Sequence, residues 1–210
     1  MDKQESAASK IFLFIIALLG WFALIAQGYI NFTSNVAPLP ELIIRYFSYF
    51  TLLTNLLVAV CCTTLLLQPN SKLAAFFSKQ NTLTAITVYI VIVGFIYNTI
   101  LRFLWKPEGL QMIVDELLHS VIPALFLIYW LVFIPKFKLQ WNSFFPWLIY
   151  PLLYIIYILI RGAFSGFYPY PFINAAAIGL KQAIINSVGI AMAFMLVSLI
   201  FISIGKRMKN

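Results

Sequence analysis

Charged residues and cysteines are scarce in this chain of 210 residues. Only 10% of the residues are charged, against about 25% in an average soluble domain, whereas 63% are hydrophobic. A chain of this size has too little interior to bury so much apolar surface, which excludes a soluble globular domain. Disorder is excluded because it requires low hydrophobicity. The only cysteines, Cys61 and Cys62, are adjacent in an apolar run, so we expect two buried thiols and no disulfide framework.

Long apolar runs fill most of the chain. A helix needs about 20 mostly apolar residues to cross a bilayer, and continuous runs without two-residue alternation favour helices over strands. The connections between the runs are short and contain most of the prolines. No internal repeat divides the sequence, which predicts one all-α domain over 1–210, a polytopic bundle of six transmembrane helices. The predicted spans are 11–30, 43–67, 83–104, 110–134, 144–161 and 183–204.

Acidic residues are fewer than basic ones, 6 against 14, which gives a net charge of +8. In a soluble chain this excess would suggest nucleic acid, but in a membrane protein it reports topology, so no nucleic-acid partner is expected. Six spans place both termini on one side. Nine of the 14 cations flank that side, which favours cytoplasmic termini. They are Lys3, Lys10, Lys72, Lys79, Lys136, Lys138, Lys206, Arg207 and Lys209.

Polar residues are rare inside the predicted spans, and five of them fall at a similar depth. At about 1.5 Å per residue, each lies roughly 22–27 Å from the cytoplasmic end of its helix. Polar groups are costly in a bilayer and therefore mark functional positions. The pattern predicts a polar pocket that opens outward above an apolar floor. The five residues are Thr51, Asn98, His119, Arg161 and Asn186.

His119 is the only histidine. It is a candidate base or ligand contact, the alternative being a packing residue. Asp115 and Glu116 precede it by four and three residues, so either carboxylate could orient the imidazole or remain solvated at the helix end. Glu116 and His119 also match half of a di-metal carboxylate site. The chain has no second Glu-x-x-His pair, so we expect neither a metal nor another cofactor.

A polar stripe runs along the second span, where Thr51, Thr54 and Asn55 occupy positions i, i+3 and i+4. A hydroxyl beside a histidine can be a nucleophile with its general base. Alternatively, each threonine hydroxyl bonds to the preceding helical turn. That alternative leaves Asn55 unexplained, because its amide requires partners across a helix interface.

Two arginines lie at predicted outer span ends. Arg102 follows Asn98 by four residues, and it either contributes to the pocket or extends to the headgroups. Arg161 leads into a segment rich in proline and aromatic residues. Tyr168 and Tyr170 of this segment are candidates to cap the pocket, the alternative being a rigid aromatic turn on the membrane surface.

Three stretches together resemble a known family, the androgen-induced membrane hydrolases, which split fatty acid esters of hydroxy fatty acids. The resemblance is to the six-helix bacterial branch of this family. They occur in the order found in the family, and the six-span layout covers nearly the whole chain. The stretches are Phe50-Thr51 followed by Asn55-Leu56-Leu57, His119-Ser120-Val121-Ile122-Pro123, and Tyr168-Pro169-Tyr170-Pro171-Phe172.

The resemblance implies a lipid-ester hydrolase in which Thr51 is the nucleophile and His119 is required as its base. It also implies a multi-pass protein of the bacterial inner (plasma) membrane, an internal eukaryotic membrane being the alternative. The family has an acid three residues after its threonine, whereas this chain has Thr54 there, so Thr54 remains an alternative nucleophile. Asn55, Asn98 or a backbone N–H is the candidate oxyanion donor.

Two other functions remain open at this point. One is a non-catalytic protein that binds or transports a lipid or small molecule through the same pocket. The other is a small structural subunit whose polar residues only join helices. Membrane lipids are the expected surroundings in each case, and a lipid ester is the expected substrate of the hydrolase.

Overall fold

The computed structural model describes residues 6–104 and 106–208. These residues form helices and connecting turns without any strand, which confirms the predicted all-α class. Six helical segments are long and apolar enough to cross a membrane, as predicted. In hydrocarbon a spanning helix satisfies every backbone N–H and C=O within itself, which is why these apolar runs are helical. The six segments are 7–33, 50–67, 80–103, 109–133, 141–165 and 180–207.

The first three spans contain α1 (Ala7–Thr33), α3 (Phe50–Leu67) and α5 (Gln80–Thr99), the last continued by the 3-10 turn η1 (Leu101–Phe103). The fourth span consists of α6 (Gly109–Glu116), the π-helical turn η2 (Leu117–Val121) and α7 (Ile122–Phe133). The last two contain η3 (Trp141–Ser143) with α8 (Phe144–Ser165), and α10 (Leu180–Arg207). Short connecting elements are α2 (Leu39–Tyr46), α4 (Lys72–Phe77), η4 (Pro171–Ile173) and α9 (Ala175–Ile178).

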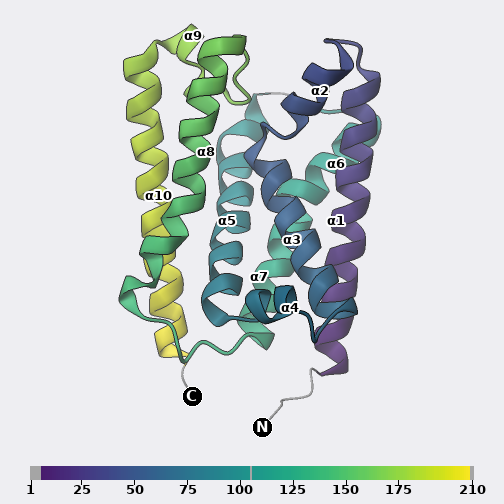
Figure 1. The fold of residues 1–210 in the computed structure, drawn as a ribbon, viewed down its shortest axis with the longest axis vertical. Coiled ribbons are helices and arrows are strands. Elements are labelled where there is room, and N and C mark those ends of the chain that lie inside the picture. The colour runs from purple at the N-terminus through teal and green to yellow at the C-terminus, as the bar shows by residue number, and fades with distance from the viewer. Residues whose placement is uncertain (1–5, 105, 209–210) are drawn as a thin grey trace.

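The helices form a bundle with α1 at one edge and the pair α8 and α10 at the other (Figure 1). The helix α3 packs mainly on α1, and α5 lies between α3, α7 and α10. The connecting helices α2 and α9 lie at the end opposite α4 and the described chain ends (Figure 1). The start of α1 and the end of α10 thus lie at the same end of the bundle, as six spans require. That this end is cytoplasmic stays a prediction, and Lys3 and Lys209 lie outside the described residues.

The predicted span 43–67 was wrong as one helix. The helix α2 ends at Tyr46, and α3 begins only at Phe50, after the extended residue Tyr49. Tyr154 of α8 stabilises this break, because its hydroxyl donates to Ser48 O at 2.8 Å and accepts from Phe50 N at 3.2 Å. A side chain distant in sequence therefore satisfies backbone groups that the interrupted helix leaves unpaired.

The predicted span 110–134 is helical, but its middle is a π-helical turn at Leu117–Val121. Pro123 follows this turn and has no backbone N–H. It can donate neither to the carbonyl of His119 nor to that of Leu118, so the regular helical ladder is interrupted there. Such π-helical turns occur frequently at functional sites.

Two details near the helix ends also differ from the sequence-based prediction. The fifth span does not end at Arg161, since α8 continues to Ser165 and ends at Gly166, whose φ of 70° suits glycine. Lys136, counted above as a topology signal, is buried, and its Nζ donates to Ile134 O at 2.7 Å and Leu131 O at 2.9 Å. Burial lowers the pKa of Lys136. This lysine therefore caps the end of α7.

The core contains large apolar side chains such as Trp130 and Phe126, both fully buried. Trp130 donates from Nε1 to Thr84 Oγ1 at 2.9 Å, so the polar group of its indole is satisfied inside the bundle. Cys61 and Cys62 are unpaired and fully buried, as expected of small apolar residues.

Candidate functional site

A cavity of about 490 Å³ lies between α1, α3, α5 with η1, α6 with η2, and the segment before η4. Four of the predicted site residues, Thr51, Asp115, His119 and Tyr170, line this cavity. Further polar walls come from three amides that sequence reasoning did not single out, Gln27, Asn31 and Gln111. The cavity therefore combines these polar groups with largely apolar walls, and of the five residues predicted to share one polar layer only Thr51 and His119 line it.

The imidazole of His119 is held on two sides. Its Nδ1 lies 2.9 Å from the backbone carbonyl of Asp115, and its ring stacks on Tyr97 with the ring centroids 4.0 Å apart. Since a carbonyl oxygen can only accept, Nδ1 carries the hydrogen of this bond. In the neutral ring the lone pair is then at Nε2, which is the nitrogen available to accept a proton.

The carboxylate of Asp115 does not contact His119. It accepts from Tyr97 Oη at 3.3 Å and from Gln111 Nε2 at 3.0 Å. Asp115 thus orients the imidazole through its backbone carbonyl and, more indirectly, by holding the tyrosine on which the imidazole stacks. The carboxylate–imidazole contact considered from the sequence is replaced by this arrangement.

A chain of amide side chains extends from Asp115 to α1. Gln111 and Gln27 bond reciprocally, with N···O distances of 2.9 and 3.2 Å, and Gln27 donates to Asn31 Oδ1 at 2.9 Å. A local signal for these residues existed in the sequence, because both Gln27 with Asn31 and Gln111 with Asp115 have the i, i+4 spacing of one helix face. Their contact across two spans was not visible there.

Thr51 lies in the first turn of α3, where a backbone N–H has no partner within the helix. Its N–H donates to Tyr170 Oη at 3.3 Å, and its Oγ1 lies 3.4 Å from the same hydroxyl. Within residues 6–104 and 106–208, no hydrogen bond joins Thr51 to His119; the cavity separates them. Thr51 is therefore positioned by the tyrosine, and it shares with His119 only the wall of the cavity.

Thr54, one turn later, has different surroundings. It is fully buried, its Oγ1 lies 3.4 Å from Tyr150 Oη, and it lines neither cavity described here. Of the two candidate nucleophiles, only Thr51 is accessible from a cavity.

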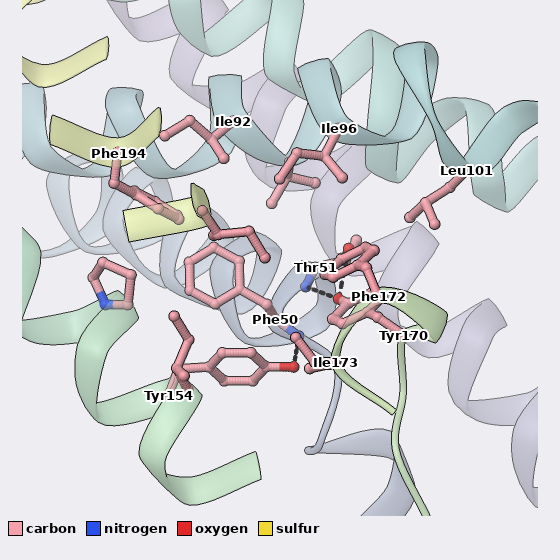
Figure 2. A pocket seen from close by; sticks show the side chains of 14 residues that line it. Phe50, Thr51, Ile92, Ile96, Leu101, Tyr154, Tyr170, Phe172, Ile173 and Phe194 are labelled. Carbon is pink, nitrogen blue, oxygen red and sulfur yellow. Dashed lines mark hydrogen bonds between the residues drawn. The ribbon is translucent and has the colours of Figure 1, made fainter. Parts of the chain in front are cut away.

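A second, narrower cavity of about 50 Å³ lies on the other side of Thr51, between α3, α5, α8 and α10. Figure 2 shows its walls, with Phe50, Tyr154 and Phe194 projecting into it and the Tyr170 hydroxyl directed at Thr51. Its lining is almost entirely apolar. Among the described residues, those that line both cavities are Thr51, Leu101 and Tyr170.

Asn55 and Asn98 line neither cavity. Asn55 Nδ2 donates to Leu118 O at 3.1 Å, and Asn98 Nδ2 donates to His119 O at 3.2 Å. These are the two carbonyls to which Pro123 cannot donate. The two asparagines, from α3 and α5, therefore stabilise the π-helical turn that presents His119, and neither contacts the space near Thr51 where an oxyanion would form.

Arg102 and Arg161 also lie outside the walls of both cavities. Arg102 pairs with Glu116 and donates to Ser120 Oγ at 3.2 Å. Arg161 donates to Glu41 Oε1 at 2.8 Å, and the same oxygen accepts from Arg45 Nε at 2.8 Å. Arg45 and Arg161 hold the pKa of the Glu41 carboxyl below its usual range. This ion cluster joins α2 to α8.

The last two predicted pocket residues serve the connecting segment. Tyr168 lies so close over Gly162 that a Cβ there would be 2.1 Å from the tyrosine ring. Asn186 donates to Phe172 O at 2.8 Å, which ties η4 to α10. Neither side chain lines the cavities, but both fix the segment that carries Tyr170.

The chain was compared with protein-family models, with curated proteins and with solved structures, and none of them matches it significantly. The resemblance drawn from the three short stretches thus remains a hypothesis about this chain.

Proposed function

We propose that this protein is a membrane-embedded hydrolase of fatty acyl esters, with Thr51 as nucleophile and His119 as general base. The observation that carries the proposal is the shared cavity, in which the accessible threonine and the chain's only histidine face one space and the histidine's Nε2 is free to accept a proton. The resemblance to the androgen-induced membrane hydrolases is its second support.

The proposed reaction proceeds through an acyl-threonine. Thr51 Oγ1 bonds to the ester carbonyl carbon while its proton passes to His119 Nε2 and the carbonyl electron pair moves onto oxygen. As the intermediate collapses, the bond to the alkoxy oxygen breaks, and His119 returns the proton to the leaving alcohol. Water then attacks the acyl-threonine, again giving a proton to His119, and the fatty acid leaves as Thr51 regains its hydrogen.

A non-catalytic lipid-binding or transport protein is the second candidate. One observation favours it: the hydroxyl of Thr51 contacts Tyr170 and makes no hydrogen bond to His119. In that case the two cavities would hold a ligand without chemistry at Thr51.

Ester turnover by point variants distinguishes the two candidates. Purified protein in lipid nanodiscs is assayed with 1-monoacylglycerols and p-nitrophenyl acyl esters. We expect Thr51→Ala and His119→Ala to lower kcat by about 10²–10⁴-fold, the usual contribution of a nucleophile–base pair, while Thr51→Ser keeps measurable activity. Thr54→Ala is the matched control, because it removes the same atoms one turn away from the cavity, and it should retain kcat within about 3-fold. A wild-type protein that binds fatty acid but turns over no ester would favour the second candidate.

We further infer that the protein lies in the bacterial inner (plasma) membrane with both termini in the cytoplasm, so that the 490 Å³ cavity is near the outer surface. Cysteine labelling tests this, since the two native cysteines are fully buried. Phe137→Cys and Val36→Cys introduce thiols at exposed positions at opposite ends of the bundle. In intact cells a membrane-impermeant maleimide should modify position 36 only; modification of position 137 instead would reverse the orientation.

A further inference from the structure

The N-terminus of α3 is surrounded by two tyrosines with different roles. The N–H of Phe50 donates to Tyr154, and the N–H of Thr51 donates to Tyr170. Tyr154 also donates its own hydrogen to Ser48 O at 2.8 Å, a normal length for this bond. The Oη of Tyr170 lies 3.4 Å from Thr51 Oγ1, which is long for an O–H···O bond. The hydroxyl hydrogen of Tyr170 is thus in a weaker hydrogen bond than that of Tyr154.

Tyr170 also keeps its hydrogen at neutral pH. Burial raises the pKa of Tyr170 above the usual value of 10.0. A neutral phenol held beside the proposed nucleophile is a hydrogen-bond donor to any oxygen that develops negative charge there.

The position of Tyr170 between the two cavities gives the orientation of a bound ester. The narrow cavity is lined by isoleucine, valine and phenylalanine side chains, and its volume of about 50 Å³ suits the first methylenes of an acyl chain next to the carbonyl. The larger cavity has mostly apolar walls but also contains amides, a carboxylate and an imidazole, which can bind the hydroxyls of a polar alcohol. Because Thr51, Leu101 and Tyr170 are the residues of the described part of the chain that line both cavities, an ester spanning them has its carbonyl beside Thr51 and Tyr170.

The charge of the larger cavity narrows the class of alcohol. Asp115 lines it, with both carboxylate oxygens accepting hydrogen bonds, and no lysine or arginine occurs among the described residues that line it. An alcohol with its own carboxylate would be placed near Asp115, and the cation beside this wall, Arg102 over the Tyr97 ring, is already paired with Glu116, so the placement is unfavourable. An uncharged, hydroxylated alcohol can bond to the amides and the carboxylate instead.

We propose that the substrate is an ester of a fatty acid with an uncharged, hydroxylated alcohol, bound across the junction of the two cavities, and that Tyr170 is a catalytic residue. Its hydroxyl donates a hydrogen bond to the carbonyl oxygen as Thr51 Oγ1 attacks, and its own O–H bond stays intact throughout. This inference rests on the proposed hydrolase function and adds a substrate class and a third catalytic group.

Tyr170→Phe tests the catalytic role, with Tyr150→Phe as the matched control. Tyr150 Oη also lies 3.4 Å from a threonine hydroxyl, that of Thr54, but lines neither cavity. Loss of one oxyanion donor typically lowers kcat by about 10²–10³-fold. We expect that loss in Tyr170→Phe with KM and the Kd of a 1-O-alkylglycerol ether nearly unchanged, and kcat within about 2-fold of wild type in Tyr150→Phe. An active wild type with an equally active Tyr170→Phe would overturn the role of Tyr170 and leave Thr51 as nucleophile.

A pair of substrates tests the class of alcohol. We expect kcat/KM for a 1-monoacylglycerol to exceed that for an acyl ester of a hydroxy fatty acid with a free carboxylate, and Asp115→Asn to reduce this preference at least 5-fold. If the carboxylate-bearing ester is the better substrate of the wild type, the assignment to uncharged alcohols is wrong. If the wild type hydrolyses neither, the proposed function itself fails.

Discussion

The polar side chains at the end of the bundle near α2 and α9 form two groups, one around the 490 Å³ cavity and one at the α8–α10 edge. The two groups differ in their hydrogen-bond partners. Around the 490 Å³ cavity, Gln27, Gln111, Asp115 and Tyr97 bond mainly to one another, next to open space. At the α8–α10 edge, Asn186 bonds to a backbone carbonyl and to a neighbouring glutamine, without lining that space. A polar residue inside a span therefore marks a candidate site only where free volume adjoins it. The following predictions test this division.

On the cavity side, we expect the largest loss of unfolding free energy from substitutions that disturb the close packing of α5 on the π-helical turn. A Cβ at Gly94 would lie 2.9 Å from His119 O and 3.1 Å from Pro123 Cβ, whereas a Cβ at Gly189 of α10 would meet nothing within 4 Å. We expect Gly94→Leu to cost about 3 kcal/mol of unfolding free energy, the upper end of ordinary overpacking costs. Gly189→Leu should change it by less than about 0.5 kcal/mol. Unfolding in mixed micelles measures both, and equal losses would remove the distinction.

Removing an asparagine side chain should cost more unfolding free energy in the cavity group than at the α8–α10 edge, and this difference should be smaller than the one between the two glycines. Asn55 is fully buried and bonds to Leu118 O, so Asn55→Ala leaves a buried carbonyl unpaired at a cost of about 2 kcal/mol. Asn186 is partly exposed, and Asn186→Ala should cost only about 1 kcal/mol. The same unfolding assay applies; a larger loss at Asn186 would contradict the ranking.

The stacking of His119 on Tyr97 should have a modest effect on stability and a clearer one on activity. Aromatic pairs contribute about 0.5–1.5 kcal/mol beyond burial, so Tyr97→Leu should destabilise by about 1 kcal/mol. It also releases the imidazole, and kcat should fall more than KM rises. Phe76→Leu is a control on α4, far from the cavity, where Phe76 is exposed. Unchanged kcat in Tyr97→Leu would show that the stacking does not position His119.

The smallest expected effect is the pH dependence of the ion cluster that joins α2 to α8. Because Arg45 and Arg161 hold the pKa of Glu41 below its usual value near 4.5, the carboxylate contributes stability above that value and loses it as the pH falls through the lower, folded-state pKa. The difference in unfolding free energy between wild type and Glu41→Gln should be a few tenths of a kcal/mol at pH 5–7 and decline as the pH falls through the folded-state pKa of Glu41. Glu108→Gln, at an exposed position, should show no such trend.

The sequence was sufficient for the features that depend on composition and length. Six apolar runs predicted six spans, and the cost of polar groups in a bilayer singled out Thr51 and His119, which line one cavity. Asp115, which lines the same cavity, was singled out by its spacing of four residues from His119. The cost of polar groups also singled out Arg161 and Asn186, because depth along a helix does not say toward which neighbour a side chain is directed.

The features that were missed depend on contacts between distant segments. Gln27 and Gln111 are 84 residues apart, and their side chains can bond to each other only because α1 and α6 lie side by side in the fold. The break before Phe50 requires the hydroxyl of Tyr154, 104 residues later. From the sequence, Lys136 is interpreted as a topology signal. In the fold its Nζ lies against the Trp130 ring and caps α7 by donating to Ile134 O. No local periodicity predicts these pairings.

The most direct test of the account is to locate the residue that a fluorophosphonate hydrolase probe modifies. After labelling in nanodiscs and proteolysis, tandem mass spectrometry should place the adduct on Thr51. The adduct should be absent in Thr51→Ala, strongly reduced in His119→Ala and retained in Thr54→Ala. An adduct on Thr54, or none on a wild-type protein that hydrolyses monoacylglycerol, would contradict the claim that Thr51 is the nucleophile.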